Sequence, residues 1–278
     1  MKKLLLLLIF IAFNLNAQQR ETVNLKWKIS DTLTYKTVMK DVIFEKSNEQ
    51  DEKDSLSKGM SGMFNAMKKQ LSNLKYETKL YPDKSGNIDI AMMLKKVEAD
   101  TTGSIFPVMA AMNGNVVLRG KISPEGEMLS FYYKRAQKNI ISVLFELPTK
   151  PVKIGDEWNL QVDMIAVDQT FKPDSIYRKN LVRLKDIKMK NGKKIAIIEY
   201  DIEEFVSGDI ENKMMSMFSK DKTDKKTFMK MSHKATAEFD LQKGYWISYE
   251  GNMNVETNIS IMGIGVNKRT EFKLTPEK

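Results

Sequence analysis

Residues 176–206 read IYRKNLVRLKDIKMKNGKKIAIIEYDIEEFV, and this stretch decides the fold class of the chain. Two runs with the residue preferences of strands flank Asn191-Gly192, and Asn-Gly is the strongest two-residue hairpin signal between such runs. We therefore predict antiparallel strands near 176–189 and 193–206, joined by a tight turn at Asn191 and Gly192.

The strand pattern continues on both sides of this hairpin. Apolar and polar residues alternate strictly over 23–29 and again over 33–39, which predicts a first hairpin with a break at Asp31. Turn residues separate the further strands, which are predicted near 73–81, 87–98, 116–122, 127–134, 157–167, 231–242, 244–256 and 258–273.

Helical spacing is confined to short segments. Apolar residues recur every three or four positions in 60–72, and 104–112, 135–146 and 209–218 are also expected to be helical. Strands therefore dominate. We expect a mainly β (α+β) fold: a large curved antiparallel sheet with two to four short helices packed on one face.

The first seventeen residues have the layout of a secretory signal peptide. Lys2 and Lys3 precede ten apolar residues, 4–13, and the small residue Ala17 follows. The apolar run is too short to cross a bilayer, and no later run approaches the ~20 residues that a membrane helix needs. We expect a signal peptide over 1–17, no transmembrane segment in the mature chain, and an exported protein that is periplasmic, on the cell surface or secreted.

One short segment, 148–158, separates the two strand-rich halves. No strong internal repeat relates these halves, and the segment carries apolar anchors. We therefore expect residues 18–278 to form a single β-rich domain; two subdomains, 18–147 and 159–278, joined by 148–158, are the alternative.

The sequence of 147–158 is LPTKPVKIGDEW. It resembles the LPxxPVxxGDxW segment of a family of secreted or lipid-anchored bacterial domains of unknown function, and the hairpin GKISPEGEM at 120–128 agrees with this resemblance. The resemblance implies a β-rich domain of the cell envelope and no mechanism.

The same segment has a structural interpretation of its own. Pro148 and Pro151 stiffen an extended passage, because each proline restricts itself and the residue before it. Gly155 and Asp156 suit a turn, and Trp158 supplies a large core anchor at the start of the next strand.

The chain contains no cysteine, which excludes several classes of protein. It has no disulfide framework, no lipid-modified N-terminal cysteine, no thiolate zinc or iron–sulfur site, and no cysteine nucleophile. The formal net charge is +9, but the basic residues between 178 and 194 fall on both faces of the predicted strands without interleaved aromatic residues. A solvated sheet edge guarded by lysine is therefore expected there, and no nucleic-acid partner.

Catalytic patterns are almost entirely missing. His233 is the single histidine, and the sequence has no nucleophile elbow, His-Glu-x-x-His pattern, P-loop or dinucleotide fingerprint. We expect no enzymatic activity and no cofactor; a hydrolase that uses His233 as its base is the alternative.

Methionine is abundant, with nineteen residues. Met229, Met231 and His233 lie at alternate positions on one face of a predicted strand, and thioether and imidazole ligands suit Cu(I). Periplasmic copper binding is therefore one hypothesis, with Met214, Met215 and Met217 as nearby candidates. The competing interpretation is that methionine fills irregular cores.

Adaptable Met-bearing surfaces also suit apolar ligands. A curved sheet with helices over its concave face could hold an acyl chain, as periplasmic lipoprotein carriers do. The leading prediction is thus a non-enzymatic protein of the cell envelope that binds a lipid, another apolar ligand or an envelope protein partner. No oligomeric state is indicated.

Four Asp-Ser/Thr pairs resemble the O-glycosylation signal of one large group of Gram-negative bacteria. Each is followed by an apolar residue or threonine, and each falls at a predicted loop or strand start. The hydroxyl groups belong to Thr32, Ser55, Thr101 and Ser175. Turn preference of Asp-Ser and Asp-Thr is the alternative explanation.

Overall fold

The computed structural model describes residues 21–43, 73–95, 116–131, 135–165, 171–210, 226–258, 260–261, 264–265 and 267–277. In chain order, the elements within these ranges are β1 (Thr22–Val23), β2 (Leu33–Ile43), β3 (Asn73–Pro82), β4 (Ile88–Leu94), β5 (Val116–Ile122), β6 (Met128–Phe131), α4 (Arg135–Phe145), β7 (Val152–Lys153), β8 (Glu157–Asn159), β9 (Phe171–Lys190), β10 (Lys193–Ile210), β11 (Thr227–Asp240), β12 (Tyr245–Thr257), β13 (Ser260–Ile261), β14 (Ile264–Gly265) and β15 (Lys268–Pro276).

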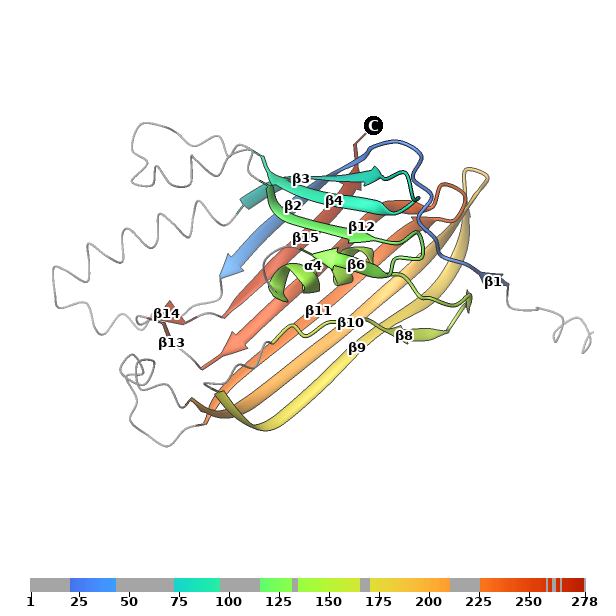
Figure 1. The fold of residues 1–278 in the computed structure, drawn as a ribbon. Coiled ribbons are helices and arrows are strands. Elements are labelled where there is room, and N and C mark those ends of the chain that lie inside the picture. The colour runs from blue at the N-terminus through green and yellow to red at the C-terminus, as the bar shows by residue number, and fades with distance from the viewer. Residues whose placement is uncertain are drawn as a thin grey trace, which may run out of the picture.

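The hairpin predicted at Asn191 and Gly192 is present and joins the two longest strands, β9 and β10. Both turn residues have positive φ angles, 50° and 74°, as a two-residue hairpin loop of type I′ requires. The pairing continues antiparallel from strand to strand, and an 11-stranded sheet results, in the order β6-β5-β4-β3-β2-β15-β12-β11-β10-β9-β8 (Figure 1). A mainly β fold with a large antiparallel sheet is therefore confirmed.

The last strand of the chain pairs with the first long one. β15 lies antiparallel beside β2, with Leu274 opposite Thr37 and Phe272 opposite Met39. This pairing places the strands before and after 148–158 in one sheet. It is also the contact that brings the N-terminal and C-terminal strands side by side (Figure 1).

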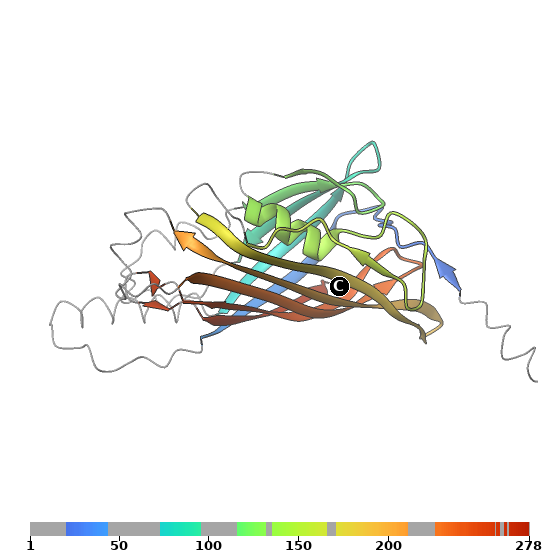
Figure 2. The same ribbon diagram turned by 90° about the horizontal axis from the view of Figure 1, so that it is seen from below.

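Helix α4 lies over one face of the sheet (Figures 1 and 2) and confirms the helix predicted at 135–146. Its buried side is built from Ile141, Val143, Leu144 and Phe145. The expected helices 60–72 and 104–112 lie outside the described residues. Of 209–218, the first two residues end β10 as a strand, and the rest also lies outside the described part of the chain.

An aromatic cluster packs the last turn of α4 against the sheet. The indole N–H of Trp27 donates to the Phe145 carbonyl at 3.0 Å, and that of Trp246 donates to the Leu144 carbonyl at 2.8 Å. The last carbonyls of a helix have no partner within the helix, so these two indoles satisfy groups that burial would otherwise leave unpaired. Trp246 also packs edge-to-face on Phe239 at 4.9 Å between ring centroids.

The prediction of a strand over 23–29 that pairs with 33–39 is wrong. Only Thr22–Val23 forms a strand, β1, and it pairs with β7. The alternation in this segment is nevertheless reflected in burial, because Leu25 and Trp27 are buried between exposed or half-buried neighbours. The backbone of Trp27 bonds to the Pro124 carbonyl instead of a neighbouring strand. An extended segment thus crosses the core without entering the sheet.

Two other strand predictions have the wrong extent. The strand expected over 157–167 ends at Asn159 in β8. One more backbone hydrogen bond joins the Leu160 N–H to the Asn180 carbonyl at 3.2 Å, and beyond it the Asn180 side-chain amide donates to the Val162 carbonyl at 2.8 Å. The strand expected over 258–273 is interrupted by the short β13–β14 pair, and β15 begins only at Lys268. An apolar pattern indicates which residues are buried, not whether their backbone is paired in a sheet. Here some of these residues lie in extended chain that pairs with no neighbouring strand.

The segment 147–158 leads from α4 to the edge strand β8. Gly155 has a φ of 93° and donates its N–H to the Leu184 carbonyl at 2.8 Å. The Asp156 carboxylate accepts the N–H of Lys153 at 2.8 Å, which closes the predicted turn. Pro148 is buried, Pro151 is exposed at the start of β7, and half-buried Trp158 lies opposite Val182 on β9. The turn at Gly155 and Asp156 is thus present, whereas Trp158 is only partly buried and packs against the core from the edge strand.

Candidate functional site

A cavity of about 270 Å³ lies between α4 and the sheet. Helix α4 contributes Asn139, Ile140, Val143 and Leu144, and four strands, β2, β11, β12 and β15, form the floor. The lining residues are Met39, Asn139, Ile140, Val143, Leu144, Met164, Met231, His233, Met253, Val255, Thr270 and Phe272. No charged side chain is among them, so an anionic group would find no ion-pair partner in the lining, which is mostly apolar.

The cavity begins where the tightly packed core ends. Toward the Trp27–Trp246 cluster the lining residue His233 is 1% exposed, and Tyr249, which contacts it, is 0% exposed. Farther along the same strands, Met231, Met253 and Phe272 are only half-buried. One end of the sheet face is thus packed by aromatic residues, and the next part is lined by half-buried, adaptable side chains.

Glu204 on β10 positions the loop that carries Met164. Its carboxylate is fully buried and accepts the backbone N–H groups of Met164 at 2.9 Å and Ile165 at 3.0 Å. Arg178 approaches the same carboxylate at 3.7 Å. A buried carboxylate needs such partners, and in return it holds the loop in place beside the cavity.

His233 lies on β11, where its ring meets the Tyr249 hydroxyl, the backbone of Asn252 and several aromatic neighbours. Its Nε2 is 2.5 Å from the hydroxyl oxygen of Tyr249, and Phe272 packs edge-on against the ring at 5.9 Å between centroids. Its Nδ1 is buried and makes no hydrogen bond of normal geometry with the described residues. One ring nitrogen is therefore held and the other is left without a normal partner.

Burial lowers the pKa of His233 from its ordinary value of 6.5 to about 4, and the backbone of Asn252 opposes this fall only in part. The ring is consequently neutral at pH 7. Burial also raises the pKa of Tyr249, so the contact between the two side chains is a neutral one.

These contacts give no support to the hydrolase alternative. A histidine base in a triad is oriented by an acid, and no carboxylate touches His233 among the described residues. Nor do three or more His, Asp and Glu side chains gather anywhere within the described ranges in a way that could hold a metal ion.

The structure brings together part of the predicted copper set and adds to it. Met231 and His233 both line the cavity, whereas Met229 is not among its lining residues. Met214, Met215 and Met217 lie outside the described residues. Three further methionines, Met39, Met164 and Met253, meet at the same cavity. They come from three different parts of the chain: strand pairing brings Met39 and Met253 to the cavity, and the contacts of Glu204 bring Met164.

Two of the four expected glycosylation positions can be located. Thr32 is exposed in the turn before β2, and Ser175 is also exposed. Ser175 does not stand at a strand start, however, because β9 begins at Phe171 and includes it. Ser55 and Thr101 lie outside the described residues.

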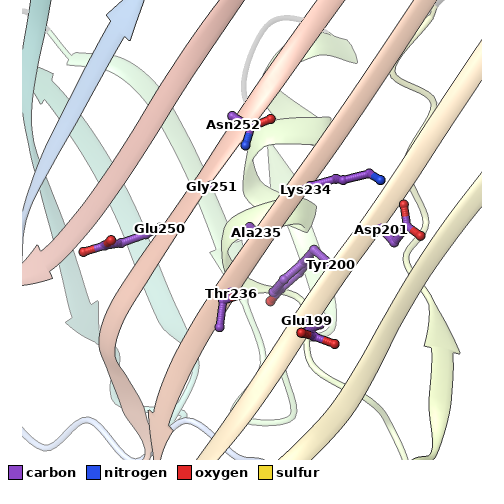
Figure 3. Close-up of a pocket in the computed structure, with 9 residues that line it drawn as sticks. All are labelled: Glu199, Tyr200, Asp201, Lys234, Ala235, Thr236, Glu250, Gly251 and Asn252. Carbon is purple, nitrogen blue, oxygen red and sulfur yellow. The ribbon is translucent and has the colours of Figure 1, made fainter.

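A second hollow, of about 420 Å³, lies on three adjacent strands, β10, β11 and β12 (Figure 3). Its lining includes Ala235 and Gly251, which lie opposite each other on β11 and β12. Its carboxylates already have basic partners: Asp201 pairs with Lys179 at 2.6 Å, and Glu199 and Glu250 pair with other lysines. The hollow is therefore part of an ion-paired surface, and we assign no ligand to it.

In the described residues, no helix is both long enough and apolar enough to span a membrane. The chain matches no protein-family model and no curated protein. The function proposed below therefore rests on the cavity and on the sequence pattern.

Proposed function

We propose that this chain is an exported, non-enzymatic protein of the bacterial cell envelope that binds the hydrocarbon part of a lipid or another apolar ligand. The observation that carries this proposal is the uncharged cavity beneath α4, with four methionines in its lining. The signal-like N-terminus supports the location in the envelope.

The size and lining of the cavity support a slender ligand. At about 270 Å³ it is slightly smaller than the ~300–1,000 Å³ typical of sites for drug-sized molecules. Because no charged side chain lines it, an anionic headgroup would find no partner inside and would stay at the half-buried end near Met231 and Met253. A single acyl chain, with its headgroup outside, fits these two requirements.

A sheet that curves around the helix would enclose such a chain. The terminal carbon of Ile141 lies against Gly120 on β5, where an added Cβ would come within 2.4 Å of it. One turn later, the Leu144 carbonyl bonds to Trp246 on β12. Five strand spacings separate β5 from β12, a distance of about 24 Å across a flat sheet. One short helix that reaches both strands supports a concave sheet face.

Binding of dodecanoate by isothermal titration tests the proposal directly. We expect saturable binding with a negative heat-capacity change, because apolar surface is buried. Met253→Glu should abolish binding, since it places a charge in the cavity. Asn254→Glu is the matched control and should bind normally, because its side chain points to the opposite face and lies opposite Arg269.

Equal binding by Met253→Glu and the unmodified chain would exclude the cavity as the site. A clean apo mass for protein from its native host, together with no dodecanoate binding, would refute lipid binding altogether. A co-purifying lipid in native mass spectrometry would support it.

Export and glycosylation predict a mass difference that can be measured in the same protein. Signal removal should leave a chain that begins at Gln18, and glycans on Thr32, Ser55, Thr101 or Ser175 should add to its mass. Exposure of Thr32 and Ser175 is compatible with modification. An intact mass equal to that of the bare chain from Gln18 would exclude glycans at these positions, and turn preference would then explain the Asp-Ser/Thr pairs. A different N-terminus would correct the predicted cleavage site.

A further inference from the structure

Strand register places three soft or borderline ligand groups on one small patch of the cavity floor. Met253 on β12 lies directly opposite His233 on β11, and Met231 lies two residues from His233 on the same face. Side chains directly opposite have Cβ atoms about 5 Å apart, and diagonal neighbours are about 7–8 Å apart. Two thioethers and one imidazole therefore stand within side-chain reach of a common point.

A third thioether, and the fourth ligand group, comes from the loop. Met164 lines the same cavity, and Glu204 fixes its backbone through two hydrogen bonds. Met229, by contrast, lies four residues from His233 along β11 and pairs with Thr257, one step farther from the patch. Met39 is three strands away from His233 in the sheet order. The compact set is thus Met164, Met231, Met253 and His233.

The geometry points to a binding site for one soft monovalent cation, Cu(I), held by the sulfur atoms of Met231 and Met253 and by Nδ1 of His233, with Met164 as the fourth ligand. Thioether and neutral imidazole are ligands that select Cu(I) over hard cations such as Mg²⁺ and Ca²⁺. No redox step is involved, since the ion enters and leaves in the same oxidation state.

The state of His233 is an independent observation in favour of this site. Its Nδ1 is buried without a normal hydrogen bond, while Nε2 is held by Tyr249. When Nε2–H donates to the tyrosine oxygen, Nδ1 carries a free lone pair, and a metal-bound histidine usually has its other nitrogen oriented in this way. The backbone of Asn252 also interacts with the ring and raises its pKa, so a cation at Nδ1 would compete with that contact.

Anaerobic titration with Cu(I) against a chromophoric competing chelator tests the site. We expect one equivalent to bind. Met231→Leu and Met253→Leu should each weaken affinity at least about tenfold, since leucine keeps the apolar volume and removes the sulfur. Met189→Leu is the matched control and should change nothing, because Met189 is 64% exposed on β9.

Ag(I), a redox-inert probe, provides a second measurement. With methyl-labelled methionine, Ag(I) should shift the signals that disappear in the Met231→Leu and Met253→Leu variants and leave the Met189 signal in place. Unchanged affinity in both leucine variants, or no Cu(I) binding by the unmodified chain, would overturn the site. Dodecanoate binding should persist in these variants, so loss of the metal site and loss of the lipid proposal give different results.

Discussion

Trp246→Ala should lower the free energy of unfolding by about 3–5 kcal/mol, a large share of the stability of a typical domain. Trp246 is 1% exposed and packs against Trp27, Phe239 and Tyr249. Its loss leaves a cavity at the centre of the core and removes the donor to the Leu144 carbonyl. α4, which covers the sheet, would lose one of its two indole contacts.

Urea denaturation followed by far-UV circular dichroism measures this effect. Trp158→Ala is the matched control, because Trp158 is half-buried on the edge strand β8 and its indole nitrogen has no hydrogen-bond partner among the described residues. We expect a clearly smaller loss for this control. Similar denaturation midpoints for the two variants would contradict the central role of the Trp27–Trp246 cluster.

Acidification from pH 6.5 to pH 5 should destabilise the protein by about 2 kcal/mol through His233 alone. Its pKa is about 4 in the folded chain and near 6.5 when unfolded, so between these values the unfolded state binds more protons. Stability therefore rises with pH across this window and is lost as the pH falls. By pH 4 the loss should approach about 3 kcal/mol.

The carboxyl groups whose pKa values are lowered titrate below the range from pH 6.5 to pH 5. Lysine partners hold the pKa values of Glu77, Asp83, Glu125 and Asp201 below the ordinary carboxyl range. Stability from such depressed carboxyls is present above their unfolded pKa values and is lost only below about pH 4.5. The range from pH 6.5 to 5 thus isolates the histidine.

The sequence contains one histidine, which makes the measurement simple. The ring proton signals of His233 in an NMR titration should report a pKa well below 6.5, and chemical denaturation at pH 6.5 and 5 should give the change in stability. His233→Gln removes the titrating group, so its stability should vary little over the same range. A histidine that titrates near 6.5 would show that the ring is not held in the buried site.

Local sequence predicted the parts of the fold that depend on neighbours in the chain. Asn191 and Gly192 can adopt positive φ angles at little cost, so the β9–β10 hairpin was predictable from two residues. The helix at 135–146 was predictable from apolar residues at helical spacing. The alternation through Leu25 and Trp27 correctly indicated which side chains are buried, but not that their backbone would bond outside the sheet.

The candidate site depends on pairings that local sequence does not specify. Met231 and His233 could be grouped because they alternate on one strand, whereas Met253 joins them only through the β11–β12 register and Met164 only through the contacts of Glu204. No short sequence pattern predicts that Tyr249 contacts one ring nitrogen of His233 in the core.

By itself, then, the sequence determined a mainly β chain, its central hairpin, the helix before 147–158 and the turn at Gly155, because each follows from the preferences of adjacent residues. Tertiary structure alone decided the pairing of β15 with β2, the approach of α4 to the sheet at Gly120 and the cavity between them. These features join residues far apart in the chain, and their free energy comes from packing and register, which a local pattern does not encode.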